Sequence, residues 1–177
     1  MNRLFLIAAL GLAAPSAHAA TPPPKPALPD AMRPLAQEAA DFFAKQKYEA
    51  AAVDYEVILK TYPDCLYAWT NLGVTRFQQG HFEEARKAFG KALSLSPNDD
   101  FVLLDLGITD FQLGLYEPAI KNLKAAIALK PNNATAHSFL ASALDKAGHH
   151  DEAQKELAIA TKLKGNDGSV EKSGPQL

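Results

Sequence analysis

The amino-acid sequence predicts an all-α protein in which about eight helices form four antiparallel pairs, stacked one on the next as an α-solenoid. Two observations support this prediction. Residues 66–99 have the pattern of two helices joined by a tight turn at Gly80, with Pro97 ending the second helix. The same pattern recurs at an interval of 34 residues, which is typical of stacked structural repeats. Because one helical hairpin cannot bury its own apolar face, stacking supplies the core.

The repeat frame also predicts where the array begins and ends. The first unit is degenerate, because Gln46 stands where the other units have a turn glycine. Gly165 replaces the closing proline of the fourth unit, so we expect the array to stop there and residues 165–177, which lack apolar periodicity, to be a disordered tail. The four units need no insertions and span residues 32–65, 66–99, 100–133 and 134–164.

Small and large apolar residues alternate in a way that suits close packing of helices. Glycine and alanine allow two helices to approach each other, and the large residues fill the space between neighbouring units. The predicted core consists of Trp69, Leu72, Gly73, Ala85, Phe89, Ala92, Leu106, Gly107, Ala119 and Ala126. In kind and spacing these residues resemble the tetratricopeptide repeat. The resemblance implies a right-handed superhelix that acts by binding another protein.

The resemblance further implies a binding groove, because in this family the first helix of each unit lines the concave face. By place in the repeat, the groove residues are Tyr67, Thr70, Val74, Phe77, Gln78, Phe101, Leu104, Ile108, Phe111, Gln112, Ser138 and Ser142. Some family members hold a peptide's terminal carboxylate with paired Lys and Asn residues, but Thr70, Val74, Leu104 and Ile108 occupy those places here. The groove instead suits a peptide with aliphatic or aromatic anchors. The alternative is that Phe77, Phe111 and Phe43 pack on one another and a terminal segment closes the groove.

Arg76 and Asp110 occupy equivalent places in consecutive units, where the family usually has an aromatic residue. Stacking brings equivalent parts of neighbouring first helices together, so we expect an ion pair between the two units, with Asp105 as a further acceptor. Such a pair would fix the register of the repeats more than it would add stability, because desolvation offsets the attraction. The alternative is two independent, solvated charges.

The N-terminus has the features of a secretory signal peptide over residues 1–19. Arg3 supplies the positive start, an apolar run from Leu4 to Ala14 follows, and Ala17-His18-Ala19 is a cleavage site. The run is too short to cross a bilayer, so no membrane insertion is expected once the signal is removed. The bacterial style of the signal favours the periplasm, with secretion as the alternative. Residues 20–31 form a proline-rich linker, interpreted either as a plain spacer or as a segment that docks in the groove.

Composition and motifs exclude several functional classes. With 21% charged residues and a formal net charge of −2, the chain has no basic surface for nucleic acid. Cys65 is the only cysteine, which leaves pairing between chains open but allows no internal disulfide. No phosphate-binding glycine loop, metalloprotease motif or nucleophile motif is present. The adjacent side chains of His149 and His150 diverge, so they make no metal site. We expect no enzymatic activity, no cofactor and no metal.

Together these features predict a non-enzymatic adaptor that binds a peptide or partner protein in an apolar concave groove. Its place would be in biogenesis of the cell envelope or in secretion. The alternative is a self-associating structural protein, a homo-oligomer whose groove is occluded by its own copies.

Overall fold

The computed structural model describes residues 28–167. The predicted signal peptide, the linker up to residue 27 and residues 168–177 lie outside this range. The described residues contain one 3-10 turn, Asp30–Met32, eight α-helices and no strand. The helices are α1 (Arg33–Ala44), α2 (Tyr48–Thr61), α3 (Leu66–Gln78), α4 (Phe82–Leu95), α5 (Asp100–Gln112), α6 (Tyr116–Leu129), α7 (Ala134–Lys146) and α8 (His150–Asp167).

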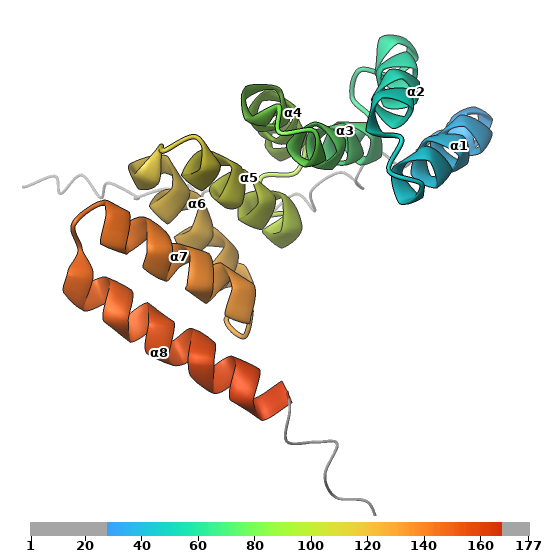
Figure 1. Cartoon of the computed structure of the whole chain (residues 1–177). Coiled ribbons are helices and arrows are strands. Elements are labelled where there is room, and N and C mark those ends of the chain that lie inside the picture. Colours follow the sequence, from blue (N-terminus) through green and yellow to red (C-terminus); the bar gives the residue numbers. More distant parts are fainter. Residues whose placement is uncertain (1–27, 168–177) are drawn as a thin grey trace, which may run out of the picture.

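The helices form four hairpins that are stacked in chain order, from α1 and α2 at one end to α7 and α8 at the other (Figure 1). Each helix packs on the next one in the chain, and α5 also contacts α3 and α7, the first helices of the units on either side. The starts of α3, α5 and α7 are 34 residues apart, as are those of α2, α4, α6 and α8. The predicted all-α solenoid is therefore confirmed.

The turns inside the hairpins need a left-handed backbone. Gly80, Gly114 and Gly148 adopt φ angles of 78°, 72° and 88° at equivalent places. Glycine enters this region without steric cost, because it has no β-carbon. In the first unit Gln46 takes the same conformation, with φ 59°. For a residue with a side chain this conformation costs about 1 kcal/mol or more, so the first hairpin is the weakest of the four at its turn.

The close approach of helices inside each unit depends on glycine at a second place. A β-carbon added at Gly73 would lie 2.6 Å from the ring of Phe89, and one added at Gly107 would lie 2.7 Å from Leu123. Both contacts join the first helix of a unit to its second helix. Of the residues predicted to form the core, Trp69 is partly exposed, and the others are buried: Leu72, Gly73, Ala85, Phe89, Ala92, Leu106, Gly107, Ala119 and Ala126.

Both ends of the array differ from the predicted boundaries. Helix α8 continues to Asp167 and includes Gly165, so the predicted start of the tail at residue 165 is wrong. Pro97 lies two residues beyond the end of α4, where a proline stops the helix. Unlike a proline, Gly165 keeps its N–H donor and has no ring that would clash with the preceding turn, so α8 continues through it. At the other end, Leu28 packs on the core of the first unit, so the last residues of the predicted linker belong to the folded domain.

Candidate protein-binding groove

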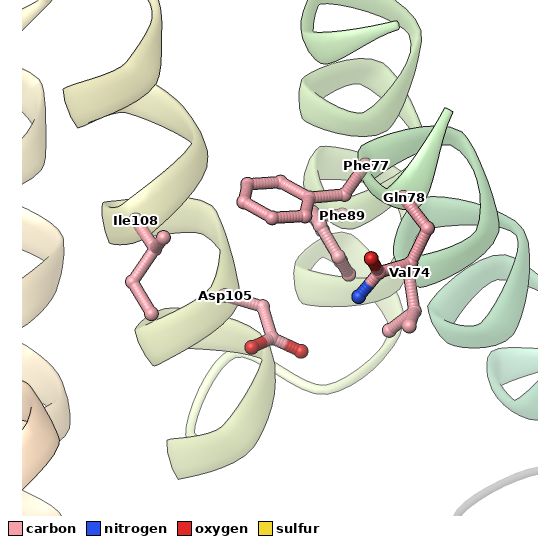
Figure 2. A pocket seen from close by; sticks show the side chains of 6 residues that line it. All are labelled: Val74, Phe77, Gln78, Phe89, Asp105 and Ile108. Atoms are coloured by element: carbon pink, nitrogen blue, oxygen red, sulfur yellow. The ribbon is translucent and has the colours of Figure 1, made fainter. Parts of the chain in front are cut away.

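The predicted groove residues all lie on the first helices of units two to four, and none of them is buried. Four of them come together with two further residues around a pocket of about 120 Å³ between α3 and α5. Figure 2 shows this pocket, which is lined by Val74, Phe77, Gln78, Phe89, Asp105 and Ile108. Four of these six residues are apolar, while the Gln78 amide and the Asp105 carboxylate, which projects from α5, supply its polar surface. We call this space the α3/α5 pocket.

The remaining predicted groove residues do not line this pocket. Tyr67 lies at the start of α3 and packs edge-to-face on Tyr55 of α2, with ring centroids 6.3 Å apart. Phe101 is 61% exposed, and the Lys130 ammonium lies 4.9 Å from its ring centroid. The N-terminal ends of α3 and α5 therefore contact residues of α2 and of the end of α6. The α3/α5 pocket lies nearer the C-terminal ends of α3 and α5.

The other predicted residues lie elsewhere on the first helices. Ser138 and Ser142 donate to backbone carbonyls of their own helix, at 2.9 and 3.1 Å. Ser142 also lines a second pocket of about 400 Å³ at the end of the array. Leu104 packs on the apolar core formed by α6, α7 and α8. Thr70 is half-buried, and Gln112 is exposed.

Aromatic pairs hold the two helices of the first three hairpins together close to the turn. Phe43 contacts Tyr48, Phe77 contacts Phe82 and Phe111 contacts Tyr116, with ring centroids 5.3, 5.2 and 5.9 Å apart. The phenylalanine comes from the first helix of a unit, and its partner is the first residue of the second helix. No ring contact joins Phe43, Phe77 and Phe111 to one another within residues 28–167, so this part of the alternative is wrong, whereas closure of the groove by a terminal segment stays a prediction.

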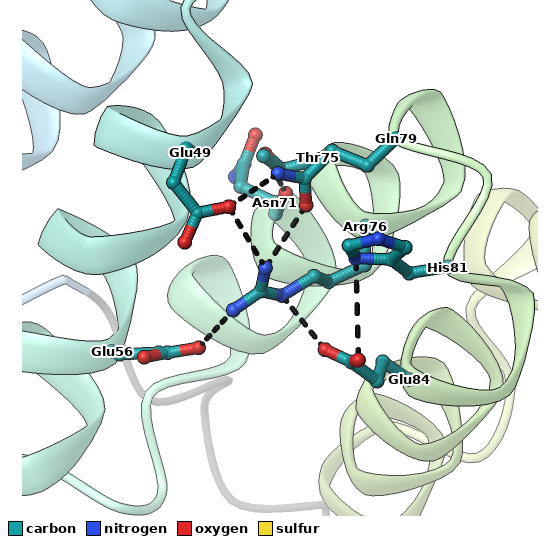
Figure 3. A network of polar contacts seen from close by, with 8 residues as sticks. All are labelled: Glu49, Glu56, Asn71, Thr75, Arg76, Gln79, His81 and Glu84. Atoms are coloured by element: carbon teal, nitrogen blue, oxygen red, sulfur yellow. Dashed lines mark hydrogen bonds and ion pairs between the residues drawn. The ribbon is translucent and has the colours of Figure 1, made fainter.

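Asp105 occupies a different position from the one that the repeat pattern predicts. The pattern predicts that it accepts from Arg76, but it lies among apolar side chains on the opposite side of α3 from the Arg76 contacts (Figures 2 and 3). Burial, with a smaller contribution from the negative charge of Asp99, raises the pKa of Asp105 to about 6. The pocket thus combines apolar side chains and an amide with a carboxylate that is poorly solvated.

The predicted ion pair between Arg76 and Asp110 is wrong, because each residue has other partners. Figure 3 shows the Arg76 guanidinium among three carboxylates: Nη2 lies 2.6 Å from Glu56, Nε 3.1 Å from Glu84 and Nη1 3.5 Å from Glu49. Only 12% of the Arg76 side chain is exposed. Gln79 accepts from Nη1 at 3.0 Å and donates to Glu49 at 2.8 Å, which completes the network.

Asp110 makes an equivalent connection one unit later. Its side chain is 1% exposed, with Oδ1 accepting from Arg86 Nε at 2.5 Å and Oδ2 accepting from Asn122 at 2.8 Å. Arg86 belongs to the second helix of the preceding unit, and Asn122 to the second helix of the same unit. The physical reason is direction: equivalent side chains on successive first helices point the same way, toward the preceding second helix, so they do not meet. Both residues still join neighbouring units.

His137 takes the structural role that Trp69 has two units earlier. Trp69 donates from Nε1 to the Pro63 carbonyl at 2.7 Å, and His137 Nε2 lies 2.9 Å from the Pro131 carbonyl. The other ring nitrogen of His137 lies 2.6 Å from a Glu156 oxygen. The His137 side chain therefore ties the loop before α7 to the helix pair.

Within residues 28–167, no group of three or more His, Cys, Asp or Glu side chains is arranged to hold a metal ion. None of the helices in this part of the chain is long and apolar enough to span a membrane. Cys65 is buried and has no disulfide partner in the described chain.

The fold and the groove define a helical-repeat scaffold, and comparisons with known proteins agree. Sequence models of the tetratricopeptide repeat match residues 66–99 and residues 110–171, which together make up more than half of the 177-residue chain. The chain therefore belongs to the tetratricopeptide repeat family. As a member of this family, it has the architecture of a scaffold for protein interactions. Comparison with curated proteins gave no match.

Solved structures similar to this chain include several of MamA. One crystal structure of MamA is 25% identical, with a TM-score of 0.70 over 72% of this chain and 74% of that chain. A second is 24% identical, with a TM-score of 0.73 over 76% and 73% of the two chains. MamA from Desulfovibrio magneticus RS-1, from residue 41 to its end, is 19% identical, with a TM-score of 0.74 over 78% of each chain. At 24% and 19% identity, the last two structures show similarity in fold alone.

Proposed function

We propose that this protein is a non-enzymatic adaptor that binds an extended or helical segment of another protein along the first helices α3, α5 and α7. One observation supports this proposal above the others. Between α3 and α5, the side chains of Val74, Phe77 and Ile108 border an open pocket instead of closing on each other. Apolar surface that is hollowed and left uncovered on a repeat protein is a usual site for an anchor residue of a partner.

Peptide selection tests this proposal without assuming a particular natural partner. Random dodecapeptides displayed on phage are selected against the folded chain, and the affinity of the best synthetic peptides is measured by fluorescence anisotropy. The doubly substituted variant Val74→Ser/Ile108→Ser should bind them at least roughly tenfold more weakly, because two walls of the pocket lose the apolar surface that the peptide would bury.

A matched control separates the groove from general apolar surface. Val57 lies on α2 and is 47% exposed, and it does not line the α3/α5 pocket. The variant Val57→Ser should bind the selected peptides as the unchanged protein does. Equal affinities for all three proteins, with folding unchanged by circular dichroism, would rule out the groove as the binding site.

Self-association is a second candidate, and one observation favours it. Tyr55, Phe89 and Leu123 occupy equivalent places in the first three units, and each is at most 1% exposed. Leu157 stands at that place in the last unit and is 56% exposed, because no fifth hairpin follows among the described residues. Sedimentation equilibrium over a wide concentration range distinguishes the candidates: a monomer supports the adaptor, and a dimer lost on Leu157→Ser supports self-association.

Export to the periplasm is the third part of the proposal, and it rests on the sequence features of residues 1–19. N-terminal sequencing of the protein from its native compartment should give a chain that starts near Ala20. An intact Met1 on the folded protein would contradict export by this route. A role in envelope biogenesis or secretion of other proteins is the biological setting we propose for such an adaptor.

A further inference from the structure

The α3/α5 pocket has a feature that a purely apolar peptide would not need. Asp105 projects from α5 into the space between Val74 and Ile108, with its carboxylate oxygens directed into the pocket (Figure 2). Among the described residues no side chain donates a hydrogen bond to this carboxylate or forms an ion pair with it, although the Gln78 amide lines the same pocket. A half-buried carboxylate without a partner costs free energy, because burial removes the water that would stabilise its charge.

The next unit shows how the equivalent space, between α5 and α7, is filled when it is part of the core. Phe139 stands one unit after Asp105, at the equivalent place on α7. Its ring packs edge-on against Phe111, with centroids 6.0 Å apart, and it is part of the apolar core of the last two units. Asp105 faces Phe77, the equivalent of Phe111, across an open pocket instead. An aromatic residue at 105 would therefore fit the architecture, and the acid leaves both a cavity and an uncompensated charge.

We infer that the α3/α5 pocket recognises a basic side chain, lysine or arginine, of the bound partner segment, flanked there by apolar residues. The aliphatic stem of such a side chain would lie against Val74 and Ile108, and its charged head would pair with the Asp105 carboxylate. The pocket, at about 120 Å³, is much larger than a single water molecule needs. This inference rests on the proposed function and adds the chemistry of the ligand to it.

Charge complementarity is the reason for choosing a basic partner segment over the other possible occupants. A neutral apolar anchor would fill the space but would remove more water from the carboxylate and give it no partner in return. An acidic group would be repelled by Asp105 and by Asp99, whose negative charge already acts on this carboxylate. A cation with a long apolar stem can pack against Val74 and Ile108 and also pair with the Asp105 carboxylate.

The test uses the peptides selected against the full chain, at a pH where Asp105 is ionised. We expect the selected sequences to be enriched in lysine or arginine beside aliphatic residues. Asp105→Asn should weaken their binding at least roughly tenfold, because a charge-assisted contact becomes a neutral one. Replacing the basic residue of the peptide by norleucine should weaken binding to the unchanged protein similarly, with little further loss on Asp105→Asn.

Two variants control for folding and for general charge effects. Asp64→Asn removes an exposed acid in the loop before α3, and it should leave the affinity unchanged. Asp105→Phe copies Phe139 and should fold at least as stably as the unchanged protein while losing the peptides. A variant that is more stable but cannot bind would support a carboxylate kept for recognition.

The outcomes separate the inference from the proposed function. Peptides that depend on Val74 and Ile108 but show no basic enrichment, and bind equally to Asp105→Asn, overturn the inference and leave the groove intact. Selection that yields no peptide dependent on Val74 and Ile108 overturns both. Stronger binding of a synthetic peptide of residues 20–27 than of any selected peptide would make the chain's own linker the occupant and overturn the partner assignment. An Asp105-dependent dimer in sedimentation would do the same in favour of a second copy.

Discussion

Arg86 of α4 and Asp110 of α5 join the second unit to the third through a hydrogen-bonded ion pair, with the Asp110 side chain 1% exposed. One junction further on, the equivalent residues are Ile120 and Leu144, which belong to one apolar core cluster. The same place in the stack is thus occupied by a charged pair at one junction and by an apolar pair at the next.

Replacing the charged pair by the apolar pair should cost no stability. The double variant Arg86→Ile/Asp110→Leu copies the next junction and removes both charges, so the desolvation penalty of Asp110 disappears with its attraction to Arg86. Urea denaturation should give a free energy of unfolding about equal to that of the unchanged protein, because the relieved desolvation of Asp110 offsets the acceptor that half-buried Asn122 loses.

The single variant Asp110→Ala is the contrasting case. Like the double variant it leaves Asn122 without its acceptor, but it also keeps the Arg86 charge without its partner and opens a cavity, so we expect a loss of about 2–4 kcal/mol. A double variant that unfolds as easily as Asp110→Ala would show that the ion pair stabilises this junction in its own right.

The contact between Gly73 and Phe89 makes a second prediction. Gly73→Ala forces the new methyl group against a ring that is 1% exposed and has no room to move, which should cost about 1–3 kcal/mol. Gly90→Ala is the matched control, since an added β-carbon there meets no atom within 4 Å. It should stabilise α4 by about 0.5–1 kcal/mol, because alanine is the better helix former. Thermal melting of both variants measures the difference, and equal melting temperatures would contradict the tight contact.

The left-handed conformation of Gln46 gives a third prediction. Gln46→Gly restores the residue that the other three turns have, and the steric strain at φ 59° is lost. The free energy of unfolding should rise by about 0.5–1 kcal/mol, the strain relieved less the extra chain entropy of glycine. Gly80→Gln makes the reverse change at an equivalent turn and should lower stability by a similar amount. A lower stability of Gln46→Gly would mean that the glutamine side chain contributes contacts that outweigh its backbone strain.

The titration of Asp105 gives a fourth prediction. Its pKa is about 6 in the folded chain and is raised from an ordinary value of 3.8, so the folded state holds this proton more tightly than the unfolded state. Between about pH 4 and pH 6 the unfolded state binds fewer protons at this site, and stability therefore falls as the pH rises.

The comparison of the unchanged protein with Asp105→Asn isolates this site, because the amide does not titrate. Relative to that variant, the unchanged protein should lose about 2 kcal/mol of stability between pH 4 and pH 7, with allowance for partial solvation of the carboxyl. Urea denaturation at the two pH values provides the measurement. A difference between the two proteins that stays constant with pH would show that Asp105 titrates normally.

The architecture can be predicted from the sequence because each unit repeats the same local signals. Gly80, the proline at 97 and the apolar spacing between them recur, so several weak signals agree. The end of α8 is less predictable. The missing proline at 165 suggests the end of the array, but a helix that no later unit covers can continue past a glycine until its last turn frays.

The contacts of individual side chains are harder to predict than the fold. Equivalent places in the repeat suggest a pair between Arg76 and Asp110, whereas equivalent side chains point in the same direction and face the preceding second helix. The sequence presents Asp105 only as an acceptor for Arg76. The unusual position of Asp105 becomes evident only by comparison with the next unit, where Phe139 fills the equivalent space by packing on Phe111, a contact that repeat spacing alone does not reveal.

The claim that a different protein occupies the groove is tested most directly by site-specific crosslinking in the native cells. A photoreactive benzoylphenylalanine replaces Gln78, which is exposed and lines the α3/α5 pocket, or Val57 on α2 as the control. The adaptor function predicts an adduct with a different protein from position 78 and none from position 57. The adduct should be lost when Val74→Ser and Ile108→Ser are added. An adduct only between two copies of this chain, or no adduct from position 78, would contradict a partner in the groove.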